Sequence, residues 1–395
     1  MVLVSLQKLK YFLVFSTVVL MFISQSVYAV HKQEINITYF TQQLKIPAAL
    51  SNLDAFIVDK GLQGALLAIK DNNTTGQFTG HQYILNAVTV PVDGDISEVY
   101  KSLNPEQNTL LISNLFRTQL EQIAQLAGQS KTLIFDVATR SDQLRYRRCY
   151  NNIFFLAPSR AMRADALAQY MLKKRWKKWF LVIGPNADDR LYASAIKRAA
   201  KRFGIKIVEE KTWTHTYDAR RTAQLDVPVF TQGVDYDVLV VADEQGLFGE
   251  YMDYRTWIPR PIIGTQGLVA TSWHRVHEQW GAVQLQNRFK EFSGRWMTEP
   301  DYAAYLAVRS IGEAITRTQS GETSKIREFL LGDKFALQGY KGKPLSFRPW
   351  SRQLRQPILL AAARSMVSVS PQDGFLHPVT ELDTLGYDEK EMQCQ

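Results

Sequence analysis

Apolar segments with the spacing of strands alternate with segments that have the spacing of helices along most of this 395-residue chain. Residues 35–40 predict a strand. Residues 61–80 begin as a helix, because apolar side chains recur at i, i+3, i+4 and i+7 from Leu62. We expect the polar residues 71–76 to end this helix and residues 82–85 to form the next strand. The chain thus begins with a strand–helix–strand unit.

The same alternation continues towards the C-terminus, and an apolar fraction of 46% is enough to fill two cores. Further helices are predicted around residues 120–127 and at 164–174, 189–203 and 302–317. Further strands are predicted at residues 110–112, 132–137, 179–183, 205–208, 237–242, 261–264, 335–347 and 357–362. This order predicts two α/β lobes, each with a parallel sheet.

The first 29 residues have the pattern of a cleavable export signal. Lys8 and Lys10 precede the apolar run 11–23, and Val27 and Ala29 occupy the positions where a signal peptidase requires small residues. We expect residues 1–29 to be a signal peptide, cleaved after Ala29, and the mature protein to be periplasmic. The alternative is a retained membrane anchor, for which the run is short, since a bilayer span needs about 20 residues.

The net charge of +9 does not indicate a nucleic-acid partner, because the basic residues are spread along the chain except at residues 173–178. That cluster lies at the end of a predicted helix, where cations complement the helix dipole. The two cysteines, Cys149 and Cys394, are expected to form one disulfide in an oxidising compartment. Two free thiols are the alternative.

Five stretches resemble, in order, the type I periplasmic substrate-binding proteins, the group that includes the leucine/isoleucine/valine-binding proteins of ATP-driven transporters. They are residues 61–80, 135–144, 180–210, 261–268 and 300–315. Residues 157–185 are similar to binding proteins associated with alcohol oxidation that depends on pyrroloquinoline quinone (PQQ). The resemblance implies an α/β fold of the periplasmic binding protein type I kind, with two Rossmann-like lobes joined by a three-segment hinge.

The resemblance also implies where the chain crosses between the lobes, namely near residues 152–155, 279–283 and 334–337. Lobe 1 would then comprise residues 30–153 and 283–334, and lobe 2 residues 154–282 and 335–370. Residues 371–395 would form a C-terminal tail. A ligand would lie between the lobes, at the carboxyl ends of the strands, where open α/β sheets bind their ligands.

The candidate ligand-binding residues all lie at or just after the ends of predicted strands. In relatives that bind amino acids, the loop that matches Thr139 offers a hydroxyl to the ligand carboxylate, and Arg140 could bind a carboxylate with both arms of its guanidinium. Arg140 could equally be a solvent-facing turn residue, and Tyr39 and Phe40 could serve lobe packing. The full set is Tyr39, Phe40, Asn114, Ala138, Thr139, Arg140, Asn186, Gln245 and Gln266.

Gln266 marks a departure from the relatives that bind amino acids. Those relatives carry a glycine-proline-glutamate-glycine turn, and its carboxylate neutralises the ligand ammonium, whereas residues 264–267 read Gly-Thr-Gln-Gly here. A buried ammonium without a counter-charge costs about several kcal/mol. We therefore expect a small organic molecule, whether alcohol, aldehyde, acid or aromatic, rather than a free amino acid.

The motifs of common enzyme classes are absent from the sequence, which has no G-x-S-x-G elbow and no P-loop. His274 and His277 have helical spacing, but no cysteine or acid nearby completes a metal site, so we expect them at the surface. Asp188 and Asp189 suit the start of a helix better than a catalytic pair of a hydrolase. The chain is thus predicted to be no enzyme and to hold no cofactor or metal.

These observations together predict an exported solute-binding protein. It would capture its ligand between two lobes and present it to an ABC permease in the inner membrane, and a link to PQQ-dependent alcohol oxidation is the narrower form of this hypothesis. The alternative is a periplasmic accessory or sensor protein of a quinoprotein dehydrogenase system without a transport role.

Overall fold

The computed structural model describes residues 32–45, 56–104, 106, 109–128, 131–214 and 219–394. The predicted signal peptide, with its cleavage after Ala29, lies outside the described residues. Within the ranges just given, no helix has the length and apolar character that crossing a membrane requires.

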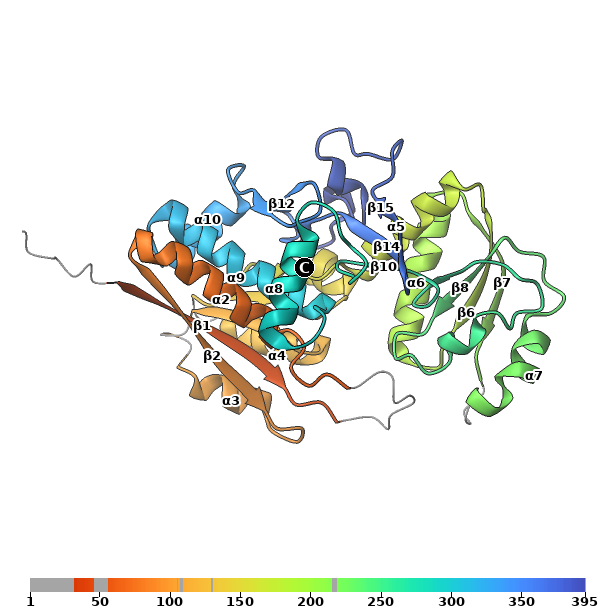
Figure 1. The fold of residues 1–395 in the computed structure, drawn as a ribbon, viewed down its shortest axis with the longest axis horizontal. Helices are drawn as coiled ribbons and strands as arrows, with labels where there is room; N and C mark the ends of the chain where they lie inside the picture. The colour runs from red at the N-terminus through yellow and green to blue at the C-terminus, as the bar shows by residue number, and fades with distance from the viewer. Residues whose placement is uncertain are drawn as a thin grey trace, which may run out of the picture.

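The first lobe is built on a sheet whose strands are all parallel, in the order β2-β1-β3-β4-β5 (Figure 1). Its central strands are buried on both faces, which explains their continuous apolar sequences. The strands are β1 (Gln33–Gln42), β2 (His81–Val90), β3 (Leu110–Asn114), β4 (Leu133–Asp136) and β5 (Ile153–Phe155).

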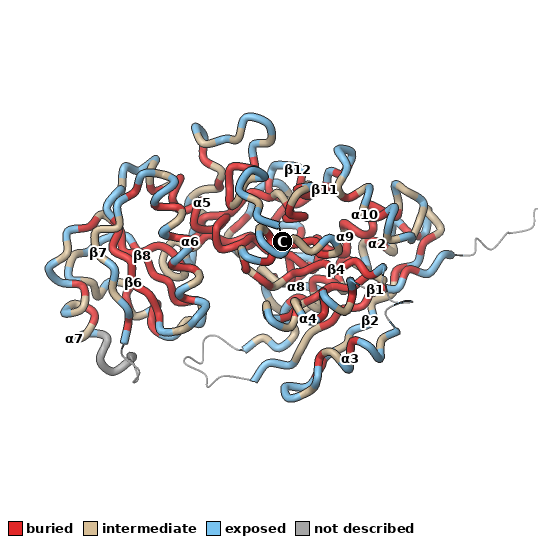
Figure 2. Tube along the Cα trace, turned by 180° about the vertical axis from the view of Figure 1, so that it is seen from behind, coloured by how far each residue is buried: buried red, intermediate tan, exposed pale blue. Residues whose placement is uncertain are grey.

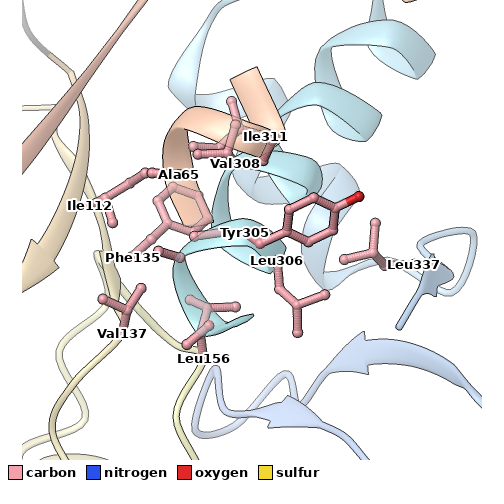
Figure 3. Packing of buried hydrophobic residues seen from close by; sticks show 14 of the residues in the cluster. Ala65, Ile112, Phe135, Val137, Leu156, Tyr305, Leu306, Val308, Ile311 and Leu337 are labelled. Carbon is pink, nitrogen blue, oxygen red and sulfur yellow. The ribbon is translucent and has the colours of Figure 1, made fainter. Parts of the chain in front are cut away.

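Helices cover both faces of this first sheet. On one face α9 packs against α2, and Tyr305, Leu306 and Val308 of α9 meet Phe135 of β4 in one apolar cluster (Figure 3). This face carries α2 (Leu62–Thr79), α8 (Ala282–Ser293), α9 (Glu299–Thr318) and α10 (Thr323–Leu331). The other face carries α3 (Ile96–Ser102) and α4 (Arg117–Ala127). The first lobe thus has three layers.

The second lobe contains a larger sheet in the order β15-β14-β10-β9-β8-β6-β7. Its strands are parallel from β7 to β10, whereas β14 and β15 are added antiparallel at one edge. The strands are β6 (Lys178–Ile183), β7 (Lys206–Thr212), β8 (Val238–Ala242), β9 (Ile262–Gly264), β10 (Leu268–Thr271), β14 (Ile358–Ala362) and β15 (Ser365–Ser370). The two α/β lobes predicted from the sequence are confirmed.

Helices again cover both faces of the second sheet. α5 (Arg160–Lys173) and α6 (Ala187–Arg202) pack on one face, and α7 (Ala219–Thr231) and the short helix η2 (Gly249–Met252) lie on the other. The buried stretches gather inside each lobe, and exposed stretches surround them (Figure 2). The basic cluster at residues 173–178 is largely exposed, as expected for the end of a helix.

The helix α2 runs farther than the sequence suggested. Residues 71–76 continue it to Thr79, so the prediction that they end the helix is wrong. Asn72 donates its amide to the carbonyl of Val308 at 2.8 Å, and Asn73 exchanges hydrogen bonds with the backbone of Tyr83. Polar residues that favour turns in isolation are held in the helix by partners on neighbouring elements.

A small antiparallel sheet follows α10 and belongs to the first lobe. It consists of β11 (Leu337–Gln338), β12 (Pro344–Phe347) and β13 (Leu354–Arg355). Leu337, Leu345 and Phe347 lie in the same cluster as α9. The third crossing therefore lies at residues 356–357, between β13 and β14, and not near residues 334–337 as expected. The other lobe limits drawn from the sequence stay predictions.

One buried lysine ties the three crossings together. Lys341 donates to the carbonyls of Ser272 and Pro357, at 3.0 and 2.9 Å, and to Oε1 of Gln356 at 2.7 Å. The amide of Gln356 donates in turn to the carbonyl of Leu156, on the first crossing, at 2.7 Å. Burial lowers the pKa of Lys341 well below its ordinary value. The hinge thus holds a buried lysine whose hydrogen-bond partners in these contacts are all neutral oxygens.

The C-terminal tail returns to the first lobe, and the predicted Cys149–Cys394 disulfide is confirmed. Before it, the tail follows the second lobe, where the backbone N–H of Gly386 donates to Asp165 of α5 at 2.8 Å. The short helices η1 (Leu144–Arg148), η3 (Glu381–Thr384) and η4 (Glu389–Glu391) complete this region. The tail therefore contacts both lobes.

Candidate functional site

Each sheet reverses its strand order at one point, and the loops that follow the strands on either side of that point face the other lobe. In the first sheet the reversal lies between β1 and β3, where the Thr41 hydroxyl donates to the carbonyl of Asn114 at 3.0 Å. In the second it lies between β6 and β8, where the N–H of Glu244 donates to Asp189 at 2.7 Å. Such points are where open α/β sheets bind ligands.

A cavity of about 560 Å³ lies between these two sets of loops. The first lobe lines it with parts of residues 41–44, 114–119 and 138–141, and the second with Arg160, parts of residues 187–191, and Glu244 and Gln245. We call it the outer chamber. Its walls mix the apolar side chains Leu44, Leu115, Phe116 and Leu191 with charged ones.

A smaller cavity of about 290 Å³ adjoins it, which we call the inner chamber. Arg140, Glu244 and Gln245 line both chambers. The inner chamber is also lined by Arg163, Tyr192, Thr265, Gln266, Val269, Ala270 and Glu299. The two chambers therefore meet at the pair formed by Arg140 and Glu244.

Ion pairs cross from one lobe to the other at this junction. Arg163 of α5 donates to both carboxylate oxygens of Glu299, at the start of α9, at 2.9 and 3.0 Å. Arg140, in the loop after β4, lies 3.5 Å from Glu299 and 3.9 Å from Glu244. Glu299 also accepts a short hydrogen bond from the backbone of Ser272. The carboxylate of Glu299, in the first lobe, thus binds both Arg163 of the second lobe and Ser272 of a crossing segment.

The electrostatics of Glu299 follow from these contacts. Burial by itself raises the pKa of this carboxyl group, but Arg163 and Arg140 outweigh it and lower the pKa to about 2. The pKa of Arg140 is lowered, first by Arg163 and then by burial. Glu299 therefore stays ionised near neutral pH, in a region where positive charge is concentrated.

The loop after β4 is held by a second, internal set of bonds. The carboxylate of Asp136, which is fully buried, accepts hydrogen bonds from the backbone N–H groups of Ala138 and Thr139 and from the Thr139 hydroxyl. Arg145 donates to the carbonyls of Thr139 and Ser141 at 2.9 and 2.6 Å, and burial lowers its pKa to about 10. The Thr139 hydroxyl is thus directed at Asp136.

Most of the predicted ligand-binding residues line one of the two chambers. Asn114, Ala138 and Thr139 line the outer chamber, and Gln266 lines the inner chamber. Arg140 and Gln245 line both.

Tyr39, Phe40 and Asn186 lie elsewhere. The Tyr39 hydroxyl donates to the carbonyl of Lys60 at 2.9 Å, Phe40 packs on Tyr100, and Asn186 caps α6. The structure therefore favours lobe packing for Tyr39 and Phe40, which was the alternative interpretation of both.

Sequence reasoning missed three charged residues of the cleft, namely Arg160, Arg163 and Glu299. The one available signal was the i, i+3 pair of arginines at the first turn of the helix that follows Pro158. His277 was expected at the surface, and that prediction is wrong: it is buried, with its ring 2.7 Å from the carbonyl of Tyr340.

Two three-layer α/β lobes, three crossings and a cavity at the strand ends define the type I periplasmic binding protein fold. Residues 50–224 match the family model described as a periplasmic binding protein. Both findings support the prediction of a binding protein that is not an enzyme. No curated protein sequence matches the chain.

Solved structures share the fold at low sequence identity. A branched-chain amino acid ABC transporter periplasmic ligand-binding protein from Burkholderia xenovorans LB400 is 14% identical, with a TM-score of 0.73, and the match covers 91% of this chain and 99% of that one. An ABC transporter substrate-binding protein from Desulfitobacterium hafniense, in complex with Leu, is 17% identical, with a TM-score of 0.65 over 85% of this chain and 99% of that one.

A third such structure is the branched-chain amino acid transporter substrate-binding protein LivJ from Streptococcus pneumoniae, in complex with isoleucine. It is 14% identical, with a TM-score of 0.63, and the match covers 86% of this chain and 99% of that one.

Proposed function

We propose that this chain is an exported solute-binding protein, which captures a small organic molecule between its two lobes and delivers it to an ABC-type permease in the inner membrane. The observation that carries the proposal is the outer chamber, about 560 Å³ in volume, to which both lobes contribute loops that follow strands. A cavity shared by two lobes couples ligand binding to their relative position.

Three further features support this proposal. The matched family model is one of periplasmic binding proteins, and the similar solved structures are ABC transporter components. The Cys149–Cys394 disulfide suits an oxidising compartment, and residues 1–29 have the pattern of an export signal. The proposed site residues are Asn114, Ala138, Thr139, Arg140, Gln245 and Gln266, which line the chambers.

A thermal-shift screen of the mature protein against alcohols, aldehydes and carboxylates tests this function. A ligand that binds only the folded state raises the melting temperature, by an amount that grows with its concentration. Small-angle scattering should then show a more compact particle with that ligand. A scattering curve that is unchanged at saturating ligand would contradict capture by closure of the lobes.

The narrower proposal is a link to PQQ-dependent alcohol oxidation. It rests on the resemblance of residues 157–185, a stretch that includes Arg160 and Arg163 of the cleft. The alternative, an accessory or sensor protein of a quinoprotein dehydrogenase without a transport role, rests on the same stretch. Co-purification with the dehydrogenase rather than with a permease would favour the alternative.

A further inference from the structure

Arg140 is a cation of the cleft that has room for another partner. Its two terminal nitrogens lie 3.9 Å from Glu244 and 3.5 Å from Glu299, and 38% of its side chain is exposed. A strong hydrogen bond between a guanidinium and a carboxylate spans about 2.7–2.9 Å. Both contacts of Arg140 are longer than that, so its planar fork is only loosely held.

Of the other arginines at the chambers, Arg117 of the outer chamber is paired with Glu121 on its own helix at 3.2 Å. Arg160 and Arg163 are buried and fully engaged. Arg160 donates to Glu244 at 2.5, 3.0 and 3.1 Å and to Asp188 at 2.8 Å. Arg163 donates twice to Glu299 and once to the carbonyl of Ala270, at 2.7 Å. Their side chains are only 8% and 6% exposed. A ligand anion would have to break short bonds to reach either of them.

The buried carboxylates of the chambers, in contrast, already have their donors. Glu244 and Glu299 form ion pairs with arginines. Asp243 accepts hydrogen bonds from the backbone N–H groups of residues 247, 248 and 249, at 2.7 to 3.0 Å. Asp188 is 56% exposed, so water screens its charge. A ligand ammonium would therefore find no buried carboxylate that lacks a cation or an N–H donor among these residues.

We infer that the ligand is a carboxylate without an ammonium group. Its carboxylate accepts hydrogen bonds from both terminal nitrogens of Arg140, and these bonds replace the long contacts of Arg140 with Glu244 and Glu299. The inference rests on the proposed binding function and names its ligand class. The exchange leaves no charge unpaired, because Glu299 keeps Arg163 and the backbone of Ser272, and Glu244 keeps Arg160.

The surroundings of Arg140 suit a short acid with an apolar body. On one side the inner chamber, about 290 Å³, offers Tyr192, Val269 and Ala270. On the other side the outer chamber offers Leu115 and Leu191. Arg140 lies at the junction of the two, so it can bind a carboxylate whose apolar body occupies either chamber.

The test is calorimetric titration of the mature protein with matched pairs that differ only at one carbon: pyruvate and alanine, 4-methyl-2-oxopentanoate and leucine, phenylpyruvate and phenylalanine. In at least one pair the oxo acid should bind about tenfold or more tightly than the amino acid, because the ammonium lacks a counter-charge. Arg140→Gln should weaken binding of that acid about tenfold or more. The control Arg148→Gln removes the same charge from an exposed residue of η1 and should leave binding unchanged.

The outcomes separate this inference from the proposed function. Tighter binding of an amino acid than of its oxo acid, or acid binding that survives Arg140→Gln, would overturn the inference and leave the binding function standing. Failure of all three acids, with an alcohol or aldehyde still bound in the thermal-shift screen, would do the same. Failure of every compound, neutral ones included, would count against the proposed function itself.

Discussion

The cleft and the hinge both contain buried basic side chains, but they hold them in different ways. In the cleft, Arg160 and Arg163 are paired with carboxylates, and the pair of Arg163 with Glu299 links the two lobes. At the hinge, Lys341 is held by three neutral oxygens, and its Nζ atom lies 4.9 Å from the centre of the Tyr302 ring.

This difference suits the two positions. The loosely held Arg140 beside these pairs can exchange its long contacts with Glu244 and Glu299 for a ligand anion, while the two buried pairs stay intact. Backbone carbonyls cannot leave the crossings that carry them, so a lysine bound to them fixes the crossings relative to one another. The cleft can thus admit a ligand anion, whereas the hydrogen bonds at the hinge hold the crossings in fixed relative positions.

Removing the shared carboxylate of the cleft should have the largest effect. Glu299→Gln leaves the guanidinium of Arg163 buried without a counter-charge, which should lower the free energy of unfolding by about 3 kcal/mol. Urea denaturation measures this. In the control Glu121→Gln, the lost partner Arg117 is 40% exposed on the same helix, and the change should stay within about 0.5 kcal/mol. Equal losses in the two variants would contradict a special role for the cleft pair.

The same carboxylate predicts a pH dependence. Its folded pKa of about 2 lies below the ordinary value of 4.5, so its stabilising contribution is complete above pH 4.5 and is lost as the pH falls towards 2. The difference in unfolding free energy between wild type and Glu299→Gln should be constant from pH 7 to 5 and then shrink. Melting curves between pH 7 and 3 measure it, and a constant difference down to pH 3 would contradict the assigned pKa.

Lys341→Met tests the hinge. It leaves the oxygens of Ser272, Gln356 and Pro357 without their donor, but no ion without its partner, so we expect a loss of about 2 kcal/mol. The control Lys343→Met removes a lysine that is 53% exposed and paired with Glu381, at a cost below about 1 kcal/mol. A hinge variant as stable as the control would show that the buried lysine does not hold the crossings.

The smallest effect is expected at Thr139. Thr139→Val removes the hydroxyl that donates to Asp136, which should cost about 1 kcal/mol in a urea titration. Because that hydroxyl is already bonded to Asp136, ligand affinity should change by less than about twofold, far less than for Arg140→Gln. A large loss of affinity with unchanged stability would mean that the hydroxyl turns to the ligand.

Much of the fold could be predicted from local patterns. The continuous apolar runs at β4 and β8 and the periodicity of α6 need only neighbouring residues to be recognised, since they reflect the burial of one strand or one helix face. The end of α2 could not be predicted in this way. Asn72 and Asn73 favour a turn by themselves, and their partners Val308 and Tyr83 come from other elements.

The candidate site could be predicted only in outline. Residues at the ends of strands are recognisable as soon as the strands are, so Asn114, Arg140 and Gln245, which line the outer chamber, could be named as candidates. Tyr39 and Phe40 end the predicted strand, but β1 runs on to Gln42, and the alternation of side chains along it directs the two rings into the clusters on opposite faces of the first sheet. A strand prediction by itself does not say which side chains at the end of the strand remain outside the core.

The sequence by itself determined the order of strands and helices, and with it the two sheets and the edge at which a ligand can bind. The order of strands and helices can be recognised from the spacing of apolar residues within each segment, because each strand or helix buries its own apolar face. Tertiary structure alone decided that Arg163 and Arg140 meet Glu299, which lies 136 and 159 residues away along the chain. A charged side chain is buried at low cost only if an opposite charge is buried beside it, and the packing of the lobes decides which residue supplies that charge.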